Sequence, residues 1–177
     1  LKKIIDGRWL QAHAVFGLYP AARVNDDDIE IRSEPPMVWR GLRMQSERPV
    51  VEGVKRPNRC LSDFVAAESD GVGDHIGLFA VTAGLGVDKK EAEFLATHDD
   101  YSAILLKALA DRLAEAAAEW LHERVRREFW GYAPAEALSH DELVREKYQG
   151  IRPAPGYPAC PDHFGKRELF RVLAPEE

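Results

Sequence analysis

A long helical pattern in the middle of the chain restricts the fold more than any other feature. Between His98 and Arg127, apolar side chains recur every three or four residues, which is the spacing of one face of an α-helix. We therefore expect one long helix with a buried face, ended by Gly131 and Pro134. The apolar positions of this pattern are Leu106, Leu109, Leu113, Ala117, Trp120 and Leu121.

Short apolar runs before this helix indicate strands. Residues 15–19 form one run, and after a turn at Pro20, Ile29 and Ile31 alternate with charged residues in a second. Residues 75–82 are β-branched and aromatic enough for a buried strand. Strands followed by helices, without regular βαβ alternation, favour an α+β fold. We expect a twisted, mainly antiparallel sheet flanked by helices, with the long helix packed across it.

Shorter helices are expected around these elements. After Gly86, Asp88 is expected to cap a helix, with Glu91 at the capping-box position. Three further helices are expected over residues 36–48, 139–147 and 161–173.

The composition suggests a single globular domain over all 177 residues. A net charge of −6 gives no overall electrostatic reason to bind nucleic acid or an anionic membrane. Cys60 and Cys160 form no Cys-x-x-Cys pair, no secretory signal precedes them, and no apolar run approaches roughly 18 residues. We therefore expect reduced thiols in a cytoplasmic protein. The chain begins without methionine, which suggests a fragment or a processed chain.

The segment GIRPAPGYPACPDH (150–163) contains four prolines and two glycines, and it is expected to form a stiff extended strip. Arg152 offers a planar fork of donors suited to a carboxylate. Gly156 leaves backbone bare for a ligand, and Tyr157 offers a ring for stacking or for contact with a cation. These residues suit a small amphiphilic molecule with a carboxylate. A proline-rich connector packed on the domain is an equally good interpretation at this point.

Acidic residues of the long helix allow two interpretations. Asp111, Glu115 and His122 fall within one narrow sector, opposite the leucine face. A solvated face explains them, and so does an acidic wall beside a cationic ligand. Glu146, shortly before the proline-rich segment, is equally ambiguous.

Other motifs favour ordinary structural explanations. Gly84-x-Gly86 follows an expected strand, but Lys89 stands where the third glycine of a dinucleotide fingerprint would be. Cys160 and His163 are close in sequence, yet proline-flanked neighbours usually point apart, so a catalytic pair is not expected. No catalytic or metal-ligating residue is therefore expected.

Two long segments carry a specific resemblance to a known family. They are YQGIRPAPGYPACPDH (148–163) and HDDYSAILLKALADRLAEAAAEWLHERVRREFWGYAP (98–134). Both resemble the activation domain of cobalamin-dependent methionine synthase. VFGLYPA, DDIEIR, RPNRCLSDFVA and IGLFAVTAG resemble the same family's earlier segments in the same order, so the likeness spans nearly the entire chain.

The resemblance implies a module that binds S-adenosylmethionine. In that family the ligand is held over a cobalamin, bound by another module, while a flavodoxin-type reductase supplies an electron and methylation restores the oxidised cob(II)alamin. Four matching positions are expected to contact the ligand: Arg152, Ala154, Gly156 and Tyr157. Two acidic positions, Glu115 and Glu146, are expected near its sulfonium.

The resemblance also implies differences from the family pattern. Family domains are longer at both ends, including a helical segment with a ligand-holding aspartate and a strand region with a ligand-contacting tyrosine. Residues 162–170, DHFGKRELF, depart from the usual acid-lysine pattern after the histidine. The 177-residue chain is therefore not expected to turn over substrate alone.

Two other functions remain open from the sequence. One is a shortened, non-catalytic module that docks a cobalamin protein or a flavodoxin-like reductase. The other is a free-standing S-adenosylmethionine-dependent methyltransferase, which should carry a glycine-rich loop after its first strand. The sequence has no such loop, so this alternative ranks last.

Overall fold

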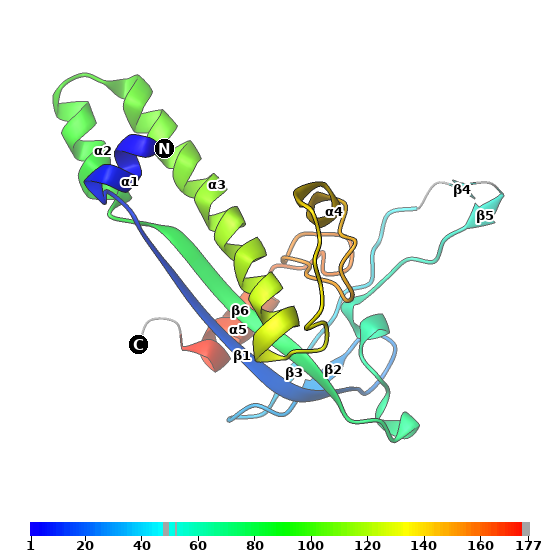
Figure 1. The fold of residues 1–177 in the computed structure, drawn as a ribbon. Helices are drawn as coiled ribbons and strands as arrows, with labels where there is room; N and C mark the ends of the chain where they lie inside the picture. Colours follow the sequence, from blue (N-terminus) through cyan, green and yellow to red (C-terminus); the bar gives the residue numbers. More distant parts are fainter. Residues whose placement is uncertain (48–49, 52, 175–177) are drawn as a thin grey trace. The chain divides into compact units, whose positions relative to one another are not determined.

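The computed structural model describes residues 1–47, 50–51 and 53–174, and they group into two compact units. The first unit contains Leu1–Val15 and Phe79–Ala135, and the second contains Phe16–Leu78 and Glu136–Glu177. Two long strands, β1 (Gln11–Arg23) and β6 (Asp74–Leu85), contribute residues to both units (Figure 1). The expected single domain over residues 1–177 stays a prediction.

The main sheet has four strands in the order β3-β2-β1-β6. β2 (Ile29–Ile31) pairs antiparallel with both β1 and β3 (Met37–Trp39). Ile29 and Ile31 are both fully buried, because alternate residues of a strand point to the same face. The expected strand at this position and the α+β class with an antiparallel sheet are confirmed.

Strand β1 is longer than the sequence suggested. It covers the expected strand over residues 15–19 but continues through Pro20 to Arg23, so the expected turn at Pro20 is wrong. Pro20 has no backbone N–H, but its carbonyl can still take part in strand pairing. It accepts a hydrogen bond from the backbone N–H of Arg32 at 2.9 Å. β6 covers the expected strand over residues 75–82.

The helix expected over residues 36–48 is wrong for residues 36–47, and residue 48 lies outside the described residues. Met37 and Trp39 are buried while Val38 between them is exposed, which is the alternation of a strand. Ile31 of β2 pairs with Met37. Antiparallel pairing with the preceding strand β2 therefore overrides the local helical spacing.

The second unit contains several short elements in its loops. They are β4 (Val50–Val51) paired with β5 (Val54–Lys55), and two 3₁₀ turns, η1 (Leu61–Phe64) and η2 (Glu68–Asp70). The Arg43 guanidinium ties these loops together. It donates to both Asp63 carboxylate oxygens at 2.7 and 2.9 Å, to Asp27 at 3.0 Å, and to the Asn58 carbonyl at 2.9 Å. The hydrogen bonds that Arg43 donates to the Asp63 carboxylate lower the pKa of Asp63.

The first unit contains α1 (Lys2–Gly7) and α2 (Val87–Ala96). The N-cap of α2 is Gly86, with φ 97°, and Asp88 lies in the first turn, so the expected Asp88–Glu91 capping box is wrong. A glycine is required at this cap because a Cβ there would lie 2.6 Å from the Trp9 carbonyl oxygen.

The long helix is confirmed as α3 (Asp100–Arg124), which packs beside α2 (Figure 1). Asp99 caps it by accepting a hydrogen bond from the Ser102 N–H at 3.0 Å. A π-helical turn, η3 (Val125–Phe129), follows it, and the regular structure ends before Gly131 as expected.

The buried face of α3 differs from the expected one. Leu106 and Leu121 are buried as expected, but Trp120 is 56% exposed, which contradicts its expected place on the buried face. Three alanines at similar spacing complete the buried stripe, because a small side chain lets a neighbouring element approach closely. They are Ala103, Ala110 and Ala118.

Two helices follow in the second unit. The expected helix over residues 139–147 is confirmed in part as α4 (His140–Val144), opened by a capping box between Ser139 and Glu142. The expected last helix is α5 (Gly165–Leu173), which contacts β3. Gly165 makes this contact close, because a Cβ there would overlap the Trp39 ring.

Candidate functional site

The candidate ligand-binding segment is folded into two successive turns, so the expected extended strip is wrong for residues 154–160. The Tyr157 N–H donates to the Ala154 carbonyl at 3.1 Å, and the Cys160 N–H donates to the Tyr157 carbonyl at 2.8 Å. The Gly156 N–H closes the structure by donating to the Cys160 carbonyl at 2.8 Å. We call residues 154–160 the double turn.

Prolines and one glycine explain this shape. Pro155 and Pro158 stand at the second position of their turns, where a fixed φ near −65° is favourable. Gly156 follows Pro155 with φ 107°, a conformation that the third position of a type II turn requires and that side chains oppose. The prolines therefore shape the segment as expected, but they bend it rather than extend it.

Three of the four exposed residues of the double turn are ones that the sequence assigned to ligand contact, and the fourth is Pro158. Tyr157 is 62% exposed, Ala154 and Gly156 are also exposed, and Arg152 just before them is half-buried. The tyrosine ring and the backbone around the glycine are therefore accessible to a small molecule.

The side of Gly156 on which a side chain would stand is occupied by His163. A Cβ built there would lie 2.8 Å from Cε1 and 3.0 Å from Nε2 of His163, so the imidazole ring occupies that space. The sequence interpretation considered His163 only as a partner of Cys160 and missed this contact. A Pro-Gly turn predicts where the glycine needs room, but the path of the chain decides which side chain fills it.

Glu146 stands in a conformation that normally selects glycine. It follows α4 with φ 53°, its N–H donates to the Leu143 carbonyl at 2.9 Å, and the Lys147 N–H donates to the Glu142 carbonyl at 3.0 Å. This pair of hydrogen bonds is the Schellman arrangement, whose left-handed position is usually glycine. A side chain at this position costs some stability, as it does at Arg8, His98 and Ala174, which also have positive φ.

The acidic sector expected on α3 is only partly present. Asp111 and Glu115 are exposed, and Glu115 pairs with Arg112 at 2.9 Å. His122 is buried instead, and its Nδ1 lies 2.7 Å from Nη1 of Arg126, so its expected place on the exposed face is wrong. Burial follows from tertiary packing, which helical spacing alone does not reveal.

Five of the six predicted ligand-binding residues belong to the second unit, and one belongs to the first. Arg152, Ala154, Gly156 and Tyr157 lie on one short segment, and Glu146 belongs to the same unit. Glu115 belongs to the first unit, so its role beside the ligand stays a prediction.

Cys160 is not suited to be a nucleophile. Its side chain is buried, and burial is the main cause that raises the pKa of the thiol to about 11. The thiol is therefore protonated at neutral pH. Among the residues that the structure describes, no group of three or more His, Cys, Asp or Glu could hold a metal ion.

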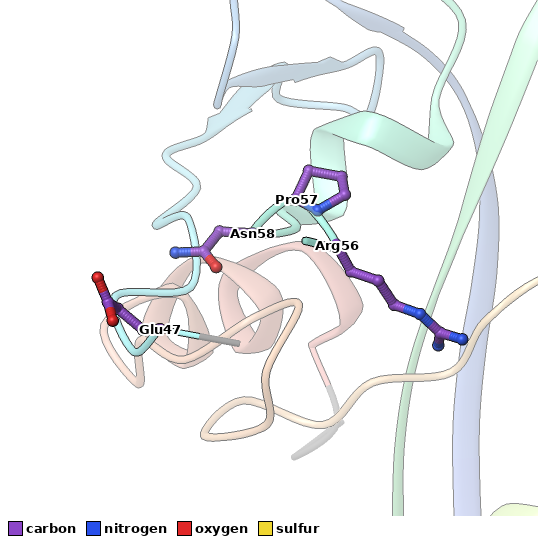
Figure 2. Close-up of a pocket in the computed structure, with 4 residues that line it drawn as sticks. All are labelled: Glu47, Arg56, Pro57 and Asn58. Carbon is purple, nitrogen blue, oxygen red and sulfur yellow. The ribbon is translucent and has the colours of Figure 1, made fainter. Parts of the chain in front are cut away.

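Two hollows in the second unit lie at other residues. One, of about 360 Å³, is lined by Glu47, Arg56, Pro57 and Asn58, and Figure 2 shows the Arg56 and Glu47 side chains pointing away from each other. The other, of about 550 Å³, has Arg23, Asn25 and Glu68 in its lining. The linings given by the described residues include none of the residues from Arg152 to Tyr157.

The fold and the candidate site together define an α+β module with an exposed double turn. The sequence model described as "Vitamin B12 dependent methionine synthase, activation domain" matches residues 1–177, so the chain belongs to this family. Among the described residues, no helix is both long enough and apolar enough to cross a membrane.

A crystal structure described as the MetH reactivation domain bound to AdoHcy is similar to the chain. The two sequences are 52% identical, and the TM-score is 0.85. The alignment covers 99% of this chain and 54% of the other, so the chain spans about half the length of that relative.

Proposed function

We propose that the chain binds S-adenosylmethionine at the double turn and presents its methyl group for the reductive methylation of cob(II)alamin. The observation that carries this proposal is the 52% identical relative bound to AdoHcy. AdoHcy, S-adenosylhomocysteine, is the molecule that remains when S-adenosylmethionine gives up its methyl group. A site that holds one is therefore suited to the other.

The chemistry of the segment fits the parts of this ligand. Arg152 can pair with the ligand carboxylate through two parallel hydrogen bonds. The exposed ring of Tyr157 can contact the base or the sulfonium, and Ala154 and Gly156 offer backbone for close approach. The carboxylate of Glu146 then balances the positive sulfonium. The expected role of Glu115 near the sulfonium stays a prediction.

The chain's own contribution to the reaction is positioning. A methyl group held in line with its acceptor replaces a rare encounter by a fixed geometry. The cobalamin, bound by another module, supplies the cobalt that accepts the methyl group. One electron from a flavodoxin-type reductase balances the step, and AdoHcy is left on the site. No side chain of this chain needs to act as nucleophile.

Partners and context follow from the same proposal. The cobalamin-binding module of methionine synthase and the flavodoxin-type reductase are the proposed protein partners, in the cytoplasm. The methyltransferase reaction that makes methionine belongs to the whole enzyme. We expect no turnover by the 177-residue chain alone.

Isothermal titration with S-adenosylmethionine and AdoHcy tests the proposal. We expect binding by the parent chain and its loss in Arg152→Ala. Arg56→Ala is the control, because Arg56 is another arginine of the second unit but is exposed and lines the hollow in Figure 2. Binding lost in the control and kept in Arg152→Ala would contradict the proposal. No binding by the parent would favour a docking module without ligand affinity.

A further inference from the structure

We infer that His163 is a positioning residue of the double turn: its imidazole ring supports one side of Gly156 and keeps the ligand-binding backbone in place. The inference rests on the proposed function for the identity of the ligand. The contact itself does not depend on that function.

The His163 ring occupies the space that a side chain at Gly156 would need. A Cβ at Gly156 would come within 2.8 Å of the His163 ring, a distance that real Cβ atoms essentially never show. Glycine is therefore required here for two independent reasons, its φ of 107° and the ring beside it.

His163 is held by the start of α5. Its carbonyl accepts a hydrogen bond from the Lys166 N–H at 3.2 Å, and the preceding Asp162 carboxylate accepts one from the Phe164 N–H at 3.0 Å. Gly165, two residues further, lies against the Trp39 ring of the buried sheet. The imidazole is thus carried by a segment that is fixed to the core of the second unit.

The double turn needs such an external support. Its three hydrogen bonds join Ala154, Gly156, Tyr157 and Cys160 to one another, so they define its shape but not its position. The Cys160 side chain is buried and anchors the end of the double turn, whereas the Tyr157 side chain is 62% exposed. The His163 ring supplies a contact at the glycine, where the ligand is proposed to approach.

Loss of the ring should affect geometry more than global stability. His163 is exposed, so His163→Ala leaves little buried surface without a partner, and we expect a melting temperature within about 2 °C of the parent. A small displacement of a binding group is costly, because misplacement by about 1 Å can reduce a rate roughly 100-fold. We expect roughly 10-fold weaker AdoHcy binding.

Hydrogen exchange without ligand tests the support directly. In His163→Ala, the amides of Gly156 and Cys160 should exchange at least about 10-fold faster than in the parent, while the amide of Ile31 keeps its protection. His163→Phe retains a flat ring and should restore protection. His13→Ala, which removes another exposed histidine, is the control and should change neither amide.

The outcomes separate this inference from the proposed function. Unchanged protection in His163→Ala, or no rescue by His163→Phe, would overturn the role of His163 whatever binds. If exchange changes as expected but the parent does not bind AdoHcy in a parallel titration, the support stands and the proposed function fails. Weakened binding in His163→Ala with rescue by His163→Phe supports both.

Discussion

The long helix α3 and the double turn are specified by the sequence in different ways. In α3, burial is spread over five apolar residues at helical spacing, so no single one decides the shape. In residues 154–160, three hydrogen bonds, two prolines and one glycine decide it. A helix therefore depends on a pattern, whereas the proposed ligand-binding segment depends on the identity of individual residues.

Exchanging glycine and alanine in the two regions should give the largest contrast. Gly156→Ala forces a side chain into φ 107° and against the His163 ring, and we expect AdoHcy affinity to fall by about 100-fold or more. Ala116→Gly on the exposed side of α3 should cost about 1 kcal/mol of stability and leave affinity unchanged. Titration and urea denaturation measure the two effects.

The same substitution in the His163→Ala variant separates the two reasons for glycine. If the His163 ring is what opposes the new Cβ, Gly156→Ala should weaken AdoHcy binding less in the His163→Ala variant than in the parent protein. Equal losses in both backgrounds would show that the glycine is needed only for its φ.

Gly165→Ala tests whether the contact between α5 and β3 tolerates an added methyl group. The added Cβ would overlap the buried Trp39 ring, so we expect a loss of about 1–3 kcal/mol in the free energy of unfolding. Gly73→Ala is the control, since nothing lies within 4 Å of the Cβ it would add. Similar urea midpoints for both variants would argue against the close approach of α5 and β3.

Glu146→Gly should separate stability from binding. Glycine adopts φ 53° without strain, so we expect a gain of about 0.5–1 kcal/mol in stability together with weaker binding of S-adenosylmethionine. Glu146→Gln keeps the strain and removes only the charge, so its affinity should fall without any gain in stability. Unchanged affinity in both variants would remove Glu146 from the site.

The smallest effect is expected at the cap of α4. The Ser139 backbone N–H and hydroxyl donate to the Glu142 carboxylate and lower the pKa of Glu142. Because this pKa is lower in the folded state, the contact stabilises the protein above the unfolded-state pKa, and its contribution is lost as the pH falls through the folded-state pKa. Ser139→Ala should therefore be less stable at pH 7, and its difference from the parent should shrink below about pH 4.5. A difference that does not vary with pH in thermal melts would contradict this account.

Local patterns in the sequence predicted local structure well. The spacing of Leu106 and Leu121 predicted α3, and the alternation at Ile29 and Ile31 predicted β2, because both patterns act between near neighbours. The expected helix over residues 36–48 failed because Met37 pairs with Ile31 of another strand. The spacing of apolar residues within one segment does not predict which other segment that segment will contact.

The candidate site was identified from the sequence by the chemistry of the residues from Arg152 to Tyr157 and by the family resemblance, and its role in ligand binding stays a prediction. In the structure Ala154, Gly156 and Tyr157 are exposed and Arg152 is half-buried. The bent shape of this segment, the ring of His163 at Gly156 and the burial of His122 all depend on tertiary contacts. The strained φ of Glu146 likewise became visible only in the structure.

Backbone amide NMR of the chain during titration with AdoHcy tests the central claim most directly. The account predicts that the largest shift changes fall on residues 150–163 and on Glu146. Changes concentrated instead on Glu47 and residues 56–58, or on residues 23–26, would place the ligand in one of the two hollows and contradict it.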